Sequence, residues 1–245
     1  MPGDRLLGVD TQASLEAVLD QALQGINADA IIASGDLAHD PTLGVYQRFL
    51  ETVCRFSDAP LLCLPGNHDI LAVMQAAALP LAPLELGMWS LVPLDSHEDD
   101  APCALITASD RAHTERALAG AQGRYCLVAT HHPLVPINSP WLDKDRIQNA
   151  QELLEWLAEC SAREGVGRLR SVVFGHAHQI VEQTCGTVPV FGTPSTCFQF
   201  LPGSETFTLD TLSPGYRWLE LTDDGEVHTA VRRVDSFPIH VQLNT

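Results

Sequence analysis

The chain has 245 residues, of which 45% are hydrophobic and 18% are charged, and this composition is typical of a globular protein. Its formal net charge is −17, with 14 Lys and Arg residues against 31 Asp and Glu residues. Nucleic acids bind to basic surfaces, so this charge argues against DNA or RNA as a partner. The sequence has no apolar stretch of membrane-span length and no secretory pattern, so we expect a cytoplasmic protein without a membrane partner.

Three segments have the apolar spacing of amphipathic helices. The first covers residues 15–23 and stops before Gly25, a good residue to follow a helix. The second begins at Asp40 and Pro41, a favourable N-cap and first helical residue. The third covers about residues 144–164. These helices alternate with apolar runs of strand length, which predicts an α/β sheet.

Four of those apolar runs end abruptly in polar residues that can bind metal. They are "AIIASGD" ending at Asp36, "PLLCLPGNHD" ending in Asn67, His68 and Asp69, "YCLVATHHP" with His131 and His132, and "SVVFGHAH" with His176 and His178. Each motif alone is a weak signal, but all four occur where a strand is predicted to end. Sites in α/β sheets form at the carboxyl ends of strands, so we expect these side chains to meet.

The residue types in this set predict a catalytic metal site. A carboxylate, an amide oxygen and several imidazoles form a mixed oxygen and nitrogen set that suits Mn²⁺, Fe or Zn²⁺. Two metals about 3.5–4 Å apart can hold the attacking and leaving oxygens of a phosphoryl displacement. Metal charge would also explain how so acidic a protein binds a phosphate.

The last part of the chain has a different pattern. From about residue 181 short strand-like segments follow one another, including "SETFTLD" and an Asp224-Gly225 turn between alternating segments. We expect residues 181–245 to form an antiparallel, β-rich part of a single domain over residues 1–245.

The ordered set "GD", "GNHD", "HHP" and "GHAH" resembles the calcineurin-like metallophosphoesterases. More narrowly, "LLGVDTQASLEAVLD", "SPWLDKDRIQNAQEL", "TPSTCFQF" and "FTLDTLSPGYRWLEL" resemble the bacterial class III 3′,5′-cyclic AMP phosphodiesterases. The resemblance covers nearly the whole chain. It implies a two-sheet α/β sandwich with α-β-β-α layers and a dinuclear centre of Fe or Mn, or Zn, at the strand ends.

The resemblance also implies roles for the strand-end residues. Asp36 would bridge both metals, and Asn67, His131 and His176 would complete the second metal. His178 would bind the first metal.

Two further residues would act on the substrate. His68 would face the substrate phosphate and stabilise the transition state or protonate the leaving 3′ oxygen, with Asp69 as its orienting partner. His132 either takes part in this site or packs beside the ligand that it follows. The implied reaction is in-line attack of a metal-bound hydroxide on 3′,5′-cyclic AMP, giving 5′-AMP. The alternatives are a broader phosphodiesterase for 2′,3′-cyclic nucleotides or linear diesters, and a catalytically impaired relic that binds a nucleotide or a protein partner.

The sequence departs from the family pattern in one place. Relatives begin with a strand ending in Asp-x-His, which supplies two ligands to the first metal, and no such motif precedes "GD" here. Asp10 is no substitute, because no histidine follows two residues later. We therefore expect a shortened version of a longer protein, poorly soluble or weakly active, with a degenerate form as the alternative.

Overall fold

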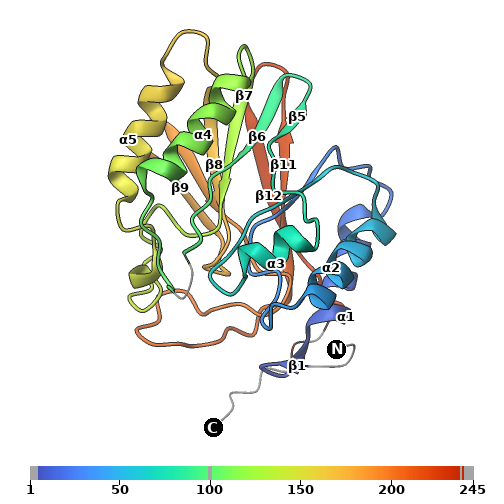
Figure 1. Ribbon diagram of the computed structural model, residues 1–245. Coiled ribbons are helices and arrows are strands. Elements are labelled where there is room, and N and C mark those ends of the chain that lie inside the picture. Colours follow the sequence, from blue (N-terminus) through green and yellow to red (C-terminus); the bar gives the residue numbers. More distant parts are fainter. Residues whose placement is uncertain (1–4, 99–100, 238, 240–245) are drawn as a thin grey trace.

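The computed structural model of the protein describes residues 5–98, 101–237 and 239 (Figure 1). The helices are α1 (Thr11–Leu23), α2 (Leu43–Phe56), α3 (Leu71–Ala76), α4 (Ala108–Gly120) and α5 (Ala150–Ser161), with the short 3-10 helix η1 (Asp143–Asp145). The strands are β1 (Arg5–Leu6), β2 (Val9–Asp10), β3 (Ile31–Ala33), β4 (Leu61–Cys63), β5 (Leu84–Leu86), β6 (Trp89–Pro93), β7 (Tyr125–Thr130), β8 (Arg168–Phe174), β9 (Val181–Cys185), β10 (Val188–Gly192), β11 (Gly215–Leu221) and β12 (Val227–Arg233).

A six-stranded sheet forms the centre of the fold. Its strand order is β5-β6-β7-β8-β10-β9, with β6, β7, β8 and β10 parallel and the two edge strands antiparallel to their neighbours. Three two-stranded pairs accompany it: β3 with β4 in parallel, and β11 with β12 and β1 with β2 antiparallel. The β11–β12 hairpin turns at the predicted Asp224-Gly225 pair.

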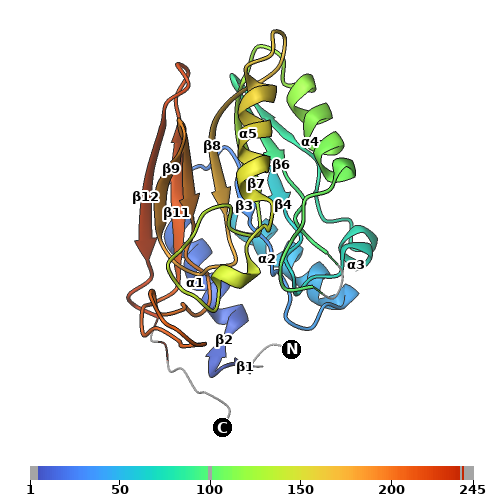
Figure 2. The same cartoon turned by 90° about the vertical axis from the view of Figure 1, so that its left-hand side faces the viewer.

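Both faces of the central sheet are buried, as expected for parallel strands. In β7, Cys126 and Val128 belong to the core under α4 and α5, whereas Leu127 and Ala129 face the layer made by β3–β4 and β11–β12. The opposite face of β3–β4 packs on α1, α2 and α3. In Figure 2, α4 lies to the right of the strands and β11–β12 to the left. The predicted α-β-β-α layering is confirmed, although the second strand layer consists of two separate pairs.

The predicted helices differ from the observed ones mainly at their first turns. The helix over residues 15–23 is confirmed as α1. The second helix starts later than Asp40 and Pro41 predict, because the Thr42 hydroxyl accepts a hydrogen bond from the Val45 N–H and forms the cap. The third helix is shorter than predicted, because Arg146 is extended and Ile147 forms a bridge with Ala104.

Some elements were not predicted at all. The sequence patterns did not predict α3, α4, β5 or β6. "SETFTLD" is not a regular strand, and Leu209 forms only an isolated bridge with Phe200. No helix in the described parts of the chain is long and apolar enough to cross a membrane.

The topology places the metal-binding motifs. Asp36 follows β3, Asn67 follows β4, His131 follows β7, and His176 follows β8. Because β3 runs parallel to β4, and β7 runs parallel to β8, the residues within each pair of motifs lie at the same edge of their layer.

We predict that Leu127→Ala will strongly destabilise the protein. Leu127 is fully buried between the two strand layers, so the substitution leaves a cavity and should lower the free energy of unfolding by about 2–5 kcal/mol. Leu105→Ala is the matched control, because Leu105 is 56% exposed and its loss should cost less than about 0.5 kcal/mol. Urea unfolding measures both, and equal effects would contradict the layered packing.

Candidate metal centre

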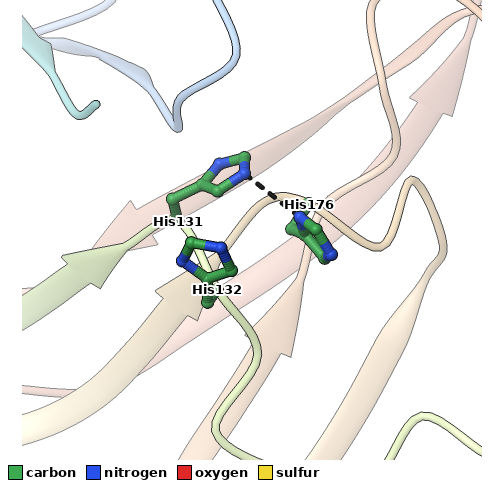
Figure 3. Close-up of side chains that lie close together, drawn as sticks. All are labelled: His131, His132 and His176. Carbon is green, nitrogen blue, oxygen red and sulfur yellow. Dashed lines mark hydrogen bonds between the residues drawn. The ribbon is translucent and has the colours of Figure 1, made fainter. Parts of the chain in front are cut away.

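Four side chains from four strand ends converge on one point. Asn67 Oδ1 lies 2.9 Å from His176 Nδ1 and 3.1 Å from His131 Nε2. His131 Nε2 lies 3.2 Å from His176 Nδ1 and 3.4 Å from Asp36 Oδ2. Figure 3 shows the rings of His131 and His176 turned toward each other. The structure therefore brings together Asp36, Asn67, His131 and His176 as the strand ends predict.

The separations fit the coordination shell of one metal ion. Ligand atoms at about 2.0–2.2 Å from a common ion lie about 3–3.5 Å apart. The Asp36 carboxylate and the Asn67 carbonyl oxygen can only accept hydrogen bonds, and a neutral imidazole offers a lone pair at one nitrogen. Such a cluster of acceptors is stable only around a cation, either a metal ion or a proton.

The electrostatics of the cluster favour ligands in their metal-binding form. Burial alone would raise the pKa of Asp36, but His131 and the His68 N–H hold this pKa well below its usual range. Burial lowers the pKa of His131, yet the facing Asp36 carboxylate raises it overall, so a proton can take the place of a metal there. Burial and the neighbouring His131 hold the pKa of His176 well below its usual value, so its ring is neutral.

The orientation of His131 is fixed from behind. Its Nδ1 lies 2.7 Å from the Ser34 carbonyl oxygen, so Nδ1 carries the proton and Nε2 is left for the cluster. This contact requires close packing of the loop after β3. A Cβ at Gly35 would lie 2.3 Å from His131 Nδ1, and one at Gly66 would lie 2.2 Å from Asp36 Oδ1. The glycines of "GD" and "GNHD" therefore permit the convergence.

The backbone is strained at the same positions. Among the described residues other than glycine, six have positive φ, and three of these are Asp36 (53°), His176 (53°) and His178 (49°). A left-handed conformation costs roughly 1–2 kcal/mol at each such residue. Strain of this kind collects at functional sites, where the surrounding structure holds it.

His178 lies two residues after His176 and has a different environment. Its Nδ1 is buried without a hydrogen-bond partner in the described chain, and so is Nε2 of His176. Burial lowers the pKa of His178 to about 4, so its ring is neutral at pH 7. The ring stacks on Phe200, with centroids 4.6 Å apart and planes 12° apart.

His68 is exposed beside the cluster. Its backbone N–H donates to Asp36 Oδ1 at 2.9 Å, so the residue is tied to the cluster while its ring faces outward. Its ring centroid is 5.3 Å from that of His39. The sequence analysis did not single out His39, although it occurs in "GDLAHD", three residues after Asp36.

Asp69 differs from its predicted contact. Its buried carboxylate accepts hydrogen bonds from the backbone N–H groups of Leu37 (3.1 Å), Ala38 (3.2 Å) and Gly66 (2.9 Å) and from the Tyr46 hydroxyl (2.9 Å). The ring of His68 is not among its partners. These contacts show that Asp69 joins the loops after β3 and β4, and its role in orienting the His68 ring stays a prediction.

His132 has both ring nitrogens occupied. Nδ1 lies 2.9 Å from the Ser96 hydroxyl, and Nε2 lies 3.2 Å from the Pro102 carbonyl oxygen. The residue is fully buried, and its nearest nitrogen lies within 4.8 Å of those of His131 and His176 (Figure 3). Of the two interpretations left open by the sequence, these contacts favour packing over metal binding.

The layered fold with acceptor side chains at its strand ends defines a metal-dependent phosphoesterase. Residues 8–180 match the family described as calcineurin-like phosphoesterase, and the chain belongs to this family. Membership of this family implies divalent metal cofactors. The histidines that lie together, His131, His132 and His176, include side chains able to bind a metal ion.

Several curated proteins resemble the chain over most of its length. The 3′,5′-cyclic adenosine monophosphate phosphodiesterase CpdA of Pseudomonas aeruginosa is 39% identical over 248 residues, which cover 99% of this chain and 89% of that protein. The protein of the same name from Haemophilus influenzae is 37% identical over 237 residues, covering 94% and 84%. Among solved structures, GAP50, the anchor in the inner membrane complex of Plasmodium, has a TM-score of 0.61 at 10% identity and covers 100% of this chain and 87% of its own, which shows the shared fold.

We predict that acid will destabilise the metal-free protein through His132. Burial and the neighbouring His131 lower the pKa of His132 to about 3 in the folded state. An unfolded histidine has a pKa of about 6.5, so between these values the unfolded chain binds a proton that the folded chain does not. Stability is therefore complete above pH 6.5 and falls with acid, by up to about 1.4 kcal/mol per pH unit for this one group.

Urea unfolding in the presence of a chelator at several pH values tests this expectation. His132→Gln should reduce the slope of stability against pH by close to one proton. His113→Gln changes an exposed histidine and is the matched control. A slope that is the same in wild type and His132→Gln would contradict the neutral, buried state of His132.

Proposed function

We propose that the protein hydrolyses 3′,5′-cyclic AMP to 5′-AMP with the help of transition metal ions. The observation that carries this proposal is the convergence of Asp36, Asn67, His131 and His176. The choice of substrate is supported by the named relatives, which are 37–39% identical over nearly the whole chain.

The geometry of the cluster supports the assignment of one set of ligands. Asp36, Asn67, His131 and His176 would hold one ion. Asp36 and His178 would contribute to a second, as the resemblance to the family implies. The mixed oxygen and nitrogen set suits Fe or Mn, with Zn as the alternative. When bound, such ions withdraw charge from phosphoryl oxygens and make water nucleophilic near neutral pH. They also provide the positive charge that a protein of net charge −17 otherwise lacks for a phosphate.

His68 acts on the substrate itself. Its ring is exposed at the edge of the cluster while its backbone is fixed to Asp36, so it can reach a phosphate held there. From this position the imidazole stabilises charge on the phosphoryl oxygens and donates a proton to the departing 3′ oxygen. Water supplies the oxygen of the new P–O bond as the P–O3′ bond breaks. His68 gives a proton to the 3′ oxygen of 5′-AMP, and the attacking water returns a proton to His68; its second proton stays on the phosphate or passes to solvent.

We predict that the purified protein will hold about one transition metal ion per chain in the four-residue cluster. Asn67→Ala and His176→Ala should each lose this ion, because each removes one of the four ligand atoms. Elemental analysis after purification without chelators measures the content. His113→Ala is the matched control, since it removes an exposed histidine and should leave the metal content unchanged.

A folded wild-type chain without metal would speak against the metal centre. The same holds if Asn67→Ala and His176→Ala keep the metal content of the wild type. Circular dichroism of each variant separates loss of metal from loss of fold.

We predict that cyclic AMP will be hydrolysed in preference to 2′,3′-cyclic AMP and to bis(p-nitrophenyl) phosphate. His68→Ala should lower turnover of cyclic AMP by ~10²–10⁴-fold while leaving the metal content nearly unchanged, as expected for a proton donor that is not a ligand. Initial rates measured with each substrate, together with elemental analysis of the variant, provide the check.

The outcomes distinguish the remaining alternatives. Hydrolysis of the aryl diester with neither cyclic nucleotide turned over would favour a broader phosphodiesterase. Loss of metal in His68→Ala would make His68 a ligand. Metal binding without turnover of any diester would favour a protein that binds a nucleotide or a partner without catalysis.

A further inference from the structure

A row of aromatic rings leads from the metal centre to the protein surface. The His178 ring stacks on Phe200, and Phe200 contacts Phe207 with ring centroids 5.5 Å apart. Trp141 lies against both, at 5.0 Å from Phe200 and 5.3 Å from Phe207. We call Trp141, Phe200 and Phe207 the aromatic platform. His178 is thus the point where the platform meets the metal centre.

Hydrogen bonds fix the platform to the loop that carries the metal ligands. Trp141 Nε1 donates to the Ser204 hydroxyl at 3.0 Å, which joins the loop after β7 to the segment that carries Phe207. The buried Ser139 hydroxyl accepts from the Gly203 N–H at 3.1 Å and from Gln179 Nε2 at 3.2 Å. Because Gln179 directly follows His178, the platform cannot move independently of the metal-binding loop.

Phe207 is unusually exposed for a ring in such a cluster. Its exposed fraction is 46%, although its neighbours Phe200 and Trp141 are half-buried. It lies on the returning arm of a hairpin-like turn, next to Thr208, whose carbonyl oxygen accepts a hydrogen bond from the Leu201 N–H at 2.9 Å. Phe200 forms a bridge with Leu209 at the base of this turn. Its contacts with Trp141 and Phe200 have interplanar angles of 64° and 68°, so these neighbours do not stack on the faces of the ring.

We propose that the aromatic platform, with Phe207 as its outer ring, receives the purine base of the nucleotide substrate. The inference rests on the proposed function, which places the phosphate at the metal centre. In a cyclic nucleotide the ribose separates the phosphate from the base, so a base-binding surface must begin beside the metal centre and extend away from it. The platform does so, starting at His178. A rigidly held, exposed ring suits base stacking, because every base offers a π face.

The net charge of the protein also favours a ligand contact that does not depend on positive side chains. With a net charge of −17, the surface offers few cations for an anionic ligand. A neutral base can instead contribute affinity through stacking, which needs no positive side chain. Affinity for the base and affinity for the phosphate should therefore be separable by mutation.

The test compares 5′-AMP with ribose 5-phosphate, which lacks only the base. Calorimetry with the Mn²⁺-loaded protein should find that the wild type binds 5′-AMP more tightly. Phe207→Ala should weaken 5′-AMP binding by about 5- to 100-fold, the usual range for removing one stacked ring, and leave ribose 5-phosphate within about twofold of wild type. In cyclic AMP turnover the same variant should raise KM and largely keep kcat, because Phe207 does not touch the reacting atoms.

Two variants exclude a merely structural effect. Phe207→Tyr keeps the ring and should restore 5′-AMP affinity. Leu201→Ala removes another apolar side chain of the same turn, which is 41% exposed. It should leave the affinities of both ligands unchanged.

The inference is overturned if the wild type binds 5′-AMP no more tightly than ribose 5-phosphate, or if Phe207→Ala keeps the wild-type ratio of the two affinities. It is also overturned if Phe207→Ala changes only the sedimentation coefficient, since Phe207 would then be a contact between copies of the chain. If the protein hydrolyses cyclic AMP but Phe207→Ala keeps the wild-type ratio of 5′-AMP to ribose 5-phosphate affinity, the platform is refuted and the proposed function stands. Base-dependent binding of 5′-AMP without any turnover refutes the proposed function and leaves the platform standing.

Discussion

The Asp69 carboxylate is the contact on which the metal centre depends. It accepts hydrogen bonds from backbone N–H groups of two loops. Leu37 and Ala38 donate from the loop after β3, and Gly66 donates from the loop after β4. Asp36 and Asn67 lie on these same two loops, directly beside the groups that Asp69 binds. A buried carboxylate with this many donors is stable only while the loops keep their separation, and so the positions of both metal ligands are set by a residue that is not itself a ligand.

That arrangement explains why the site tolerates strain. Asp36, His176 and His178 have left-handed backbones, and Gly35 and Gly66 leave no room for a Cβ. Each of these features is unfavourable in isolation. Strands β4 and β7 and the second half of β8, which precede three of these loops, are buried and hold the loop ends in place. Conformational energy stored in the loops is thereby offset by apolar burial in the strands, away from the chemistry.

The sequence predicted which residue types meet, because strand ends are visible as apolar runs that stop at polar residues. It did not predict α4, whose helical signal is the capping box of Thr107 and Asp110 and not a stripe of apolar residues. The predicted start of α2 was wrong because the cap was misplaced. Asp40 and Thr42 are both good capping residues, and the observed cap is Thr42, whose side chain accepts a hydrogen bond from the Val45 N–H. Patterns along the chain therefore locate the strands that carry the metal-binding motifs better than they locate helix caps.

Contacts between distant segments explain what else the sequence could not reveal. The partners of His132 are Ser96 and Pro102, 36 and 30 residues away, so its packing role depends on a fold that must already be known. The same is true of Asp69, which in the sequence is simply the residue after His68. Both residues carry side chains that can act in catalysis, and in both the deciding fact is which hydrogen-bond partners the fold leaves available.

The metal centre and the aromatic platform divide the binding of one ligand between two kinds of interaction. At one end, acceptor side chains gather around a cation and can hold an anion only through that cation. At the other end, Phe207 offers an uncharged face to a base. His178 belongs to both, because its Nδ1 is buried without a partner and its ring stacks on Phe200. A displacement of this ring would therefore alter its contact with Phe200 and the position of its Nδ1 together. In the proposed complex, the conformation of the "GHAH" loop would couple the position of the phosphate to that of the base.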